Sequence, residues 1–149
     1  MEDARLVENL IYLYAERIDN GDLAGVAELF QHGEIVSTAH NTRFSGVEEV
    51  LGLYQMSCRI YDETGTPLTK HLTTNVIVEV QDKGETASAR SYYTVLQATE
   101  ALPLQAIISG RYHDQFSKRD GRWCFSRREM FVDLLGDCSA HLLYDASAL

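Results

Sequence analysis

The sequence is poor in the residues that mark a linker, a disulfide framework or a membrane span. Its 149 residues include two prolines and three cysteines, and Cys58, Cys124 and Cys138 lie far apart with no CxxC pair. No apolar run approaches the ~18 residues of a membrane-spanning helix. The start of the chain is acidic and lacks the apolar core of a signal peptide. We therefore expect reduced thiols, no zinc site and a cytoplasmic protein.

Positive charge is also scarce. The chain has 13 Lys and Arg against 22 Asp and Glu, a formal net charge of −9. An acidic surface repels phosphate backbones and anionic headgroups, so we expect neither nucleic acid nor a membrane as partner. The sequence has no glycine-rich phosphate loop, nucleotide fingerprint or metal-ligand spacing, so we expect no cofactor and no metal. A small-molecule substrate or ligand is the partner that these exclusions favour.

Length and composition indicate one folded domain over residues 1–149. The chain is 45% hydrophobic and 23% charged, close to the average for globular proteins. It contains no internal repeat. A chain of this size buries roughly 68–70% of its unfolded surface, which leaves room for a pocket inside a real core.

Helical periodicity dominates the first third of the chain. Apolar residues three and four positions apart predict a helix over residues 3–20, which Asn20-Gly21 ends. Asp22 is placed to cap a short second helix. A short strand is predicted over residues 34–37, and Ser45-Gly46 opens a third helix.

The second half is β in character. Runs rich in Val, Thr, Ile and Tyr are separated by Gly-containing turns. We predict strands over residues 70–81, 86–99, 104–118 and 123–134. Sequential strands with tight turns form an antiparallel meander, and helices followed by strands indicate an α+β protein, not α/β.

The strand predicted over residues 70–81 has an unusual pattern of faces. One face is nearly all apolar from Leu72 to Val80, and the other mixes polar and apolar residues in the order His71, Thr73, Asn75, Ile77 and Glu79. A sheet wet on one side shows cleaner alternation, so we expect both faces to be covered. Because helices can cover only one of them, we expect a homo-oligomer, a dimer or trimer, formed through the sheet.

Two residues are candidates for proton transfer. His71 begins a strand that otherwise has a core-like pattern, and Asp19 lies at a helix C-terminus, where the dipole disfavours a carboxylate. In an Asp–His pair the carboxylate orients the imidazole, and the second ring nitrogen acts as a general base worth ~10²–10⁴ in rate. Spacing alone does not bring the two residues together, and each could be an ordinary polar residue.

Several stretches, taken in order, resemble the SnoaL-like family of the nuclear transport factor 2-like superfamily. They extend to about Asp133 and comprise Tyr14 to Phe30 with Asp19 and Gly21-Asp22, then Gly46, His71-Leu-Thr-Thr-Asn75, Gly110 to Phe116, and Arg119 to Arg128. The resemblance implies a cone-shaped α+β barrel. In it three N-terminal helices pack on a curved, mostly antiparallel sheet, the sheet encloses a pocket, and dimers form through the sheet.

The resemblance also implies roles for the candidate residues. Scytalone dehydratase and hexachlorocyclohexane dehydrochlorinase carry Asp and His at the positions that match Asp19 and His71, where the pair removes a proton from carbon. His71 would then be the base and Asp19 its orienting partner. Gln97 stands where scytalone dehydratase has a second pocket histidine, and Tyr112 falls near its pocket asparagine. Scytalone itself is therefore not the expected substrate.

Further pocket residues are expected on the inner faces of the helices and strands. Alternation lets only one of Tyr92 and Tyr93, and one of Arg127 and Arg128, face inward; both choices stay open, with Arg128 favoured. The chain's eight tyrosines suggest a ring-bearing or hydroxylated apolar ligand, because buried hydroxyls need partners. The expected substrate-pocket residues are Tyr14, Phe30, Tyr54, Asn75, Tyr92, Tyr112 and Arg128.

These features favour a cofactor-independent lyase of the dehydratase type, or an isomerase, acting on a small apolar, ring-bearing or polyketide-like substrate. The alternative is a non-catalytic small-ligand-binding module or a structural β subunit of a ring-hydroxylating dioxygenase. Separation of the Asp19 and His71 side chains by more than ~3.5 Å would favour that alternative. A cyclase or epoxide hydrolase using Asp114 and Glu129 around a water has less support.

Overall fold

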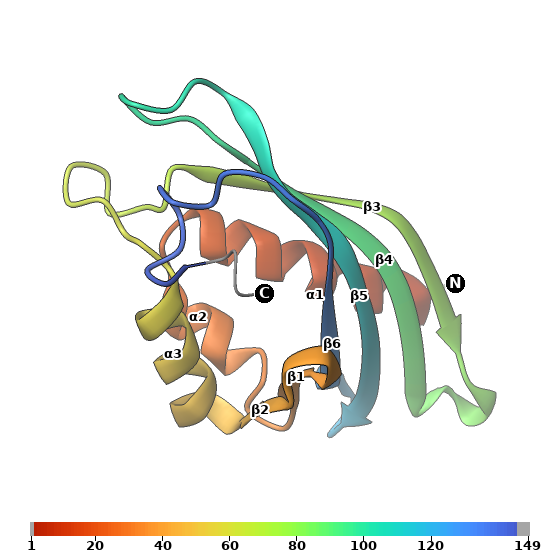
Figure 1. Ribbon diagram of the computed structural model, residues 1–149. Helices are drawn as coiled ribbons and strands as arrows, with labels where there is room; N and C mark the ends of the chain where they lie inside the picture. The colour runs from red at the N-terminus through yellow and green to blue at the C-terminus, as the bar shows by residue number, and fades with distance from the viewer. Residues whose placement is uncertain (1, 146–149) are drawn as a thin grey trace.

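Helices and strands follow one another as the sequence predicts, in a computed structural model that describes residues 2–145 (Figure 1). Two short 3₁₀ turns, η1 (Thr38–His40) and η2 (Asp82–Gly84), join neighbouring strands. The helices and strands are α1 (Glu2–Asp19), α2 (Leu23–Glu28), β1 (Glu34–Ser37), β2 (Thr42–Ser45), α3 (Gly46–Ser57), β3 (Thr69–Val80), β4 (Thr86–Gln97), β5 (Gln105–Arg119) and β6 (Arg122–Leu135).

A single six-stranded sheet forms one wall of the molecule, in the order β2-β1-β6-β5-β4-β3. All neighbours are antiparallel except β1 and β6, which run parallel. Figure 1 shows the long strands β3 to β6 bending around the helices, so that the sheet is curled and α1, α2 and α3 all lie on its concave side. The predicted α+β architecture is confirmed.

The turn between α1 and α2 fixes the end of the first helix. The buried residues of α1 recur at helical spacing, as predicted. Gly21 then adopts φ +74°, and a Cβ there would lie 2.0 Å from the carbonyl oxygen of Gly65, so only glycine fits. The Asp22 carboxylate accepts a hydrogen bond from the Gly25 N–H (2.9 Å) and caps α2. Asp19 is thereby held as the last residue of α1.

A β-bulge in β3 changes the face pattern expected for this strand. The pairing with β4 shifts between Thr74 and Ile77, and Asn75 adopts the left-handed region at φ +53°. The extra residue reverses the parity of the strand. Val76 and Val78 therefore pack against the core, and Ile77 is exposed. The expectation that Asn75 shares the inner face with His71 is wrong.

The four-residue strand β2 was not predicted. Its residues Thr42 to Ser45 are mostly exposed and pair only with β1. A short polar edge strand has no periodicity long enough to mark it in the sequence. In residues 2–145 no helix is long and apolar enough to cross a membrane.

Candidate functional site

Helix α1 and strand β3 bring the two candidate proton-transfer residues into contact. Asp19 ends α1 and His71 lies near the start of β3, and their side chains are 10% and 7% exposed. The Nδ1 of His71 lies 2.6 Å from Oδ1 of Asp19, and the His71 backbone N–H donates to Oδ2 (2.8 Å). The Thr69 hydroxyl also donates to Oδ1 (2.8 Å). The carboxylate therefore holds both the ring and the backbone of residue 71.

The charge on Asp19 decides the tautomer of His71. Burial alone would raise the pKa of Asp19, but the hydrogen bonds from His71 and Thr69 outweigh it and lower this pKa. The side chain is therefore an anion that only accepts hydrogen bonds, so Nδ1 of His71 carries the proton. In the neutral form of the ring, the other nitrogen, Nε2, is then the one that carries a lone pair.

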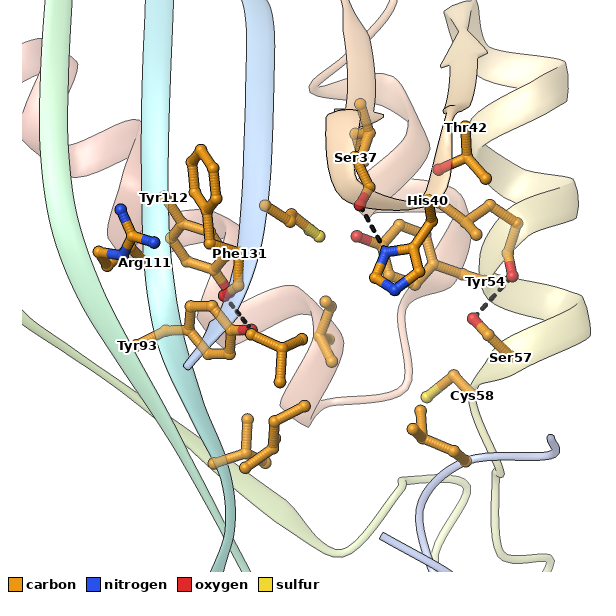
Figure 2. Close-up of a pocket in the computed structure, with 18 of the residues that line it drawn as sticks. Ser37, His40, Thr42, Tyr54, Ser57, Cys58, Tyr93, Arg111, Tyr112 and Phe131 are labelled. Carbon is orange, nitrogen blue, oxygen red and sulfur yellow. Dashed lines mark hydrogen bonds between the residues drawn. The ribbon is translucent and has the colours of Figure 1, made fainter. Parts of the chain in front are cut away.

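His71 lines a cavity of about 770 Å³ between the sheet and α3. Figure 2 shows Tyr93, Tyr112 and Phe131 on strands at one side, and Tyr54 and Ser57 of α3 with Cys58 just after it at the other. Apolar side chains make most of the wall, as in many small-molecule sites. Polar groups enter from β1 and the segment after it, where Ser37 bonds the Nδ1 of His40 at 2.8 Å.

Two tyrosines from different helices meet in the cavity wall. The hydroxyls of Tyr14 and Tyr54 are 2.5 Å apart. Burial raises the pKa of both phenols, so both stay protonated at neutral pH. One of the two hydroxyl protons serves the bond between them, and the other remains free to donate to a ligand oxygen.

Among the expected pocket residues, three tyrosines line the cavity and four residues do not. Tyr14, Tyr54 and Tyr112 are in the wall. Of Tyr92 and Tyr93, between which the sequence left the choice open, Tyr93 is the one that lines the cavity. Tyr92 is 51% exposed, because it alternates with Tyr93 along β4 and points to the other face. Asn75 lies outside the cavity because of the bulge.

Phe30 and Arg128 lie beneath the cavity wall, not in it. Phe30 stacks on Phe125 at 4.8 Å between ring centroids. Arg128 is fully buried, with its guanidinium carbon 3.7 Å from the Tyr112 ring centroid and 4.2 Å from that of Tyr14. Both residues pack against tyrosines of the wall from the side away from the cavity. The expectation that they line the pocket themselves is therefore corrected.

Arg128 also pairs with Asp114 in a buried, bidentate salt bridge. Its Nε and Nη2 each donate to one carboxylate oxygen at 2.8 Å. Glu129 instead accepts a hydrogen bond from the Thr38 hydroxyl (2.5 Å) and pairs with Arg127. The two carboxylates therefore have separate partners, and neither lines the cavity that holds His71. This arrangement does not support a two-carboxylate mechanism in that cavity.

Two cavity histidines, His40 and His141, were not among the site residues expected from the sequence. Both line the cavity. The His141 ring lies 6.2 Å from that of His71, centroid to centroid. Gln97 is buried outside the wall and donates to the carbonyls of Pro67 and Ala140. No local pattern marks either histidine, because their positions depend on contacts between distant segments.

Across residues 2–145, no group of three or more His, Cys, Asp or Glu side chains is arranged to hold a metal ion. The polar groups of the cavity include the His71–Asp19 pair, the tyrosine hydroxyls and the two further histidines. Such groups can move a proton and hold oxygen atoms of a ligand.

The curled sheet has the helices on its concave side and a cavity between them, and this is the nuclear transport factor 2-like, cystatin-like fold. An NTF2-like protein of this fold from Novosphingobium aromaticivorans has a TM-score of 0.72 and 23% identity, over 93% of this chain and 86% of that chain. A family model described as a SnoaL-like domain matches residues 1–129. The chain belongs to the SnoaL-like family, which confirms the resemblance found in the sequence.

Two further solved structures are similar over most of the chain. A Mycobacterium tuberculosis protein of unknown function is 26% identical, over 87% of this chain and 70% of that chain, with a TM-score of 0.69. A N. aromaticivorans protein, provisionally named a scytalone dehydratase, is 25% identical over 92% and 91% of the two chains, with a TM-score of 0.70. No curated protein matches the sequence significantly.

Proposed function

We propose that the protein is a cofactor-independent lyase of the dehydratase type, or an isomerase, in which His71 removes a proton from carbon. The observation that carries this proposal is the 2.6 Å contact between His71 and Asp19 at an apolar cavity. A non-catalytic ligand-binding module, or a β subunit of a ring-hydroxylating dioxygenase, has no need of an oriented, largely buried Asp–His pair. The short distance therefore favours the enzyme over that alternative.

The proton transfer follows from the hydrogen bonds of the pair. Nε2 of His71 accepts the proton, and the electron pair of the C–H bond forms a double bond to the neighbouring carbon. In an elimination that carbon releases its leaving group together with the bonding electron pair, and in an isomerisation a carbonyl carbon passes its π electron pair to its oxygen. The imidazolium that results is stabilised by the Asp19 anion, which stays in place throughout. The free hydroxyl proton of the Tyr14–Tyr54 pair can donate to an oxygen on which negative charge develops.

The cavity supports a small, mainly apolar substrate that contains a ring or a polyketide-like skeleton. Tyr93 and Tyr112 stack at 4.5 Å between ring centroids, and both line the cavity. Apolar neighbours such as Ile108 and Leu53 complete the cavity. The provisional naming of one similar structure as a scytalone dehydratase fits a reaction of this class, although Gln97 and Tyr112 argue against scytalone as the substrate.

A benzisoxazole elimination tests the base without knowledge of the natural substrate. When a base removes the ring C–H proton of a nitro-substituted benzisoxazole, the N–O bond breaks and a coloured cyanophenolate forms. We expect the wild-type protein to accelerate this reaction, and His71→Gln to lower kcat/KM by ~10²-fold or more. Asp19→Asn should give a smaller loss, because the ring remains but its tautomer and charge are no longer fixed.

The control is His32→Gln, which removes an exposed histidine from a turn outside the cavity. Circular dichroism and melting temperature check that each variant is folded. Equal turnover by wild type and by folded His71→Gln would contradict the proposed base. Binding of ring-bearing ligands without turnover would favour the non-catalytic module.

We also propose that the protein works in the cytoplasm and self-associates as a dimer or trimer through the convex face of the sheet. Leu72, Ile77 and Tyr92 are large side chains that are 44%, 45% and 51% exposed on strands β3 and β4. Cys58, Cys124 and Cys138 are all free thiols. Both features support the expectations drawn from the sequence.

A further inference from the structure

The segment after β6 folds back and contributes to the cavity wall. We call residues 137–144 the strap. In Figure 1 it is the dark blue chain that turns from the end of β6 toward the C-terminal end of α3. His141, Leu142 and Tyr144 of the strap line the cavity. The family match ends at residue 129, so these cavity residues lie outside the part of the chain that it covers.

Hydrogen bonds to three other segments hold the strap in place. The Arg59 N–H donates to the carbonyl of His141 (2.8 Å), and the Leu143 N–H donates to that of Ser57 (3.0 Å). The carbonyl of Ala140 accepts from the Tyr61 hydroxyl (2.6 Å) and from the Gln97 amide (3.1 Å). Hydrogen bonds thus hold the backbone of the strap at residues 140, 141 and 143, which fixes the point from which the His141 side chain extends.

The His141 ring lies beside the His71–Asp19 pair and has a ring nitrogen without a hydrogen-bond partner among the described residues. It lies 6.2 Å from the His71 ring at an angle of 73° and is 7% exposed. Its Nδ1 is buried and has no hydrogen-bond partner among the described residues. A buried polar atom without a partner is unfavourable, and such atoms in native proteins call for a reason. Because no hydrogen bond of Nδ1 fixes the ring, a polar ligand in the cavity can supply the missing partner.

We propose that His141 is a second hydrogen-bonding residue of the reaction centre and holds an oxygen of the substrate beside the carbon that His71 deprotonates. This inference rests on the proposed function of His71. It narrows the substrate to molecules with a hydroxyl, ether or carbonyl oxygen next to the acidic C–H. With a hydroxyl or ether, the C–H electron pair forms the new double bond and the C–O bond breaks with its electrons on oxygen; with a carbonyl, the C–H pair forms the enolate double bond and the π pair moves to the carbonyl oxygen. His141 donates a hydrogen bond to the oxygen that gains charge, and His71 is regenerated when its proton passes to the departing oxygen, or back to carbon in an isomerisation.

The electrostatics of the site suit this division of roles. Burial lowers the pKa of His141 to about 4, and the nearby His71 acts in the same direction, while Asp19 opposes them. His141 is therefore neutral near pH 7 and presents one N–H donor and one acceptor. It is a hydrogen-bond donor to developing negative charge, not a competing base. Of the two histidine rings, only that of His71 is hydrogen-bonded to Asp19, so the carboxylate orients His71 and not His141.

A benzisoxazole series with leaving phenolates of different basicity tests the role of His141. A donor to the departing oxygen helps most when that oxygen is most basic. We expect His141→Phe to lower kcat/KM by about 10–100-fold for the most basic leaving group, the size of one lost oxyanion contact or less. The loss should be several-fold smaller for the nitro-substituted compound. The plot of log kcat/KM against the pKa of the leaving phenol should therefore be steeper for His141→Phe than for wild type. His141→Gln, whose amide can donate a hydrogen bond, should bring the slope part of the way back to the wild-type value.

The arms of the experiment separate the two proposals. His32→Phe is the matched control, and should show the wild-type slope. An unchanged slope in folded His141→Phe, with His71→Gln still inactive, would overturn the role of His141 and leave the base in place. Equal loss across the series would also overturn it, since a merely structural strap residue would act that way. If His141→Phe does not fold, the test rests on His141→Gln alone. A loss of kcat/KM that is equal for all the benzisoxazoles would then contradict the proposed role of His141.

Discussion

Asp19 shows how one side chain can offset an unfavourable position. A carboxylate at the end of a helix meets the negative end of the helix dipole. Here three donors compensate, the His71 ring, the His71 backbone and the Thr69 hydroxyl, all from the start of β3. The same bonds that keep Asp19 charged also orient His71. The residue that is odd in the sequence is thus explained by its partners on a strand that lies about fifty residues further on.

His141 gives the protein a predictable sensitivity to acid. The folded pKa is lowered to about 4 from an ordinary value of 6.5, so between these values the unfolded chain binds a proton that the folded protein excludes. Stability is therefore full above pH 6.5 and falls as the pH drops toward 4, by up to about 3 kcal/mol. The lowered pKa of Asp19 matters only at lower pH, because its ordinary value is 3.8.

Urea unfolding of wild type and His141→Phe at pH 7 and pH 4.5 measures this contribution. We expect wild type to lose more stability than the variant on acidification, because the other ionisable side chains near residue 141, those of His71 and Asp19, are present in both. Parallel losses in the two proteins would show that His141 is not the group that titrates.

At the scale of elements, the bulge in β3 sets which side chains reach the core. Asn75 adopts φ +53°, a region that Asn tolerates and β-branched residues avoid. We expect Asn75→Val to lower the free energy of unfolding by about 1–2 kcal/mol, and Asn75→Gly to have little effect. Urea midpoints measure both. Thr74→Val is the matched control, because it places the same side chain one residue earlier on an exposed site without positive φ. An Asn75→Val cost no larger than that of Thr74→Val would contradict the strain argument.

The same bulge marks the limit of what the sequence predicts. Helix α1 and the four long strands were predicted to within two residues at each end, because their periodicity is local and extends over many positions. Alternation correctly required that one of Tyr92 and Tyr93 face inward. It misplaced Asn75, because a single inserted residue reverses the faces and leaves no mark in an apolar pattern. His141 was missed for another reason: the strap has no periodicity, and only contacts with Ser57, Arg59 and Gln97 bring it to the cavity.

At the scale of the whole molecule, the proposed self-association has a direct test. Sedimentation at micromolar concentration should show a dimer or trimer for wild type. Tyr92→Glu places a charge on the convex face and should shift the protein toward monomer, since buried unpaired charge is costly. Met56→Glu is the control, because Met56 is also an exposed apolar side chain, 64% open to solvent, but lies on α3. A wild-type monomer, or equal effects of both variants, would contradict association through the sheet.

The proposed reaction centre has two parts, the His71–Asp19 pair and His141 on the strap, and these could change independently in evolution. The dyad is built into α1 and β3, where a substitution disturbs the core and the sheet. His141 is carried on a short segment outside every strand and helix, anchored mainly through backbone carbonyls and amides. Backbone anchors accept many side chains, so the strap sequence can vary while its path is kept. A family with this plan can acquire new substrates by exchanging a few residues at the rim, and strap grafting between relatives offers a route to redesign that leaves the base untouched.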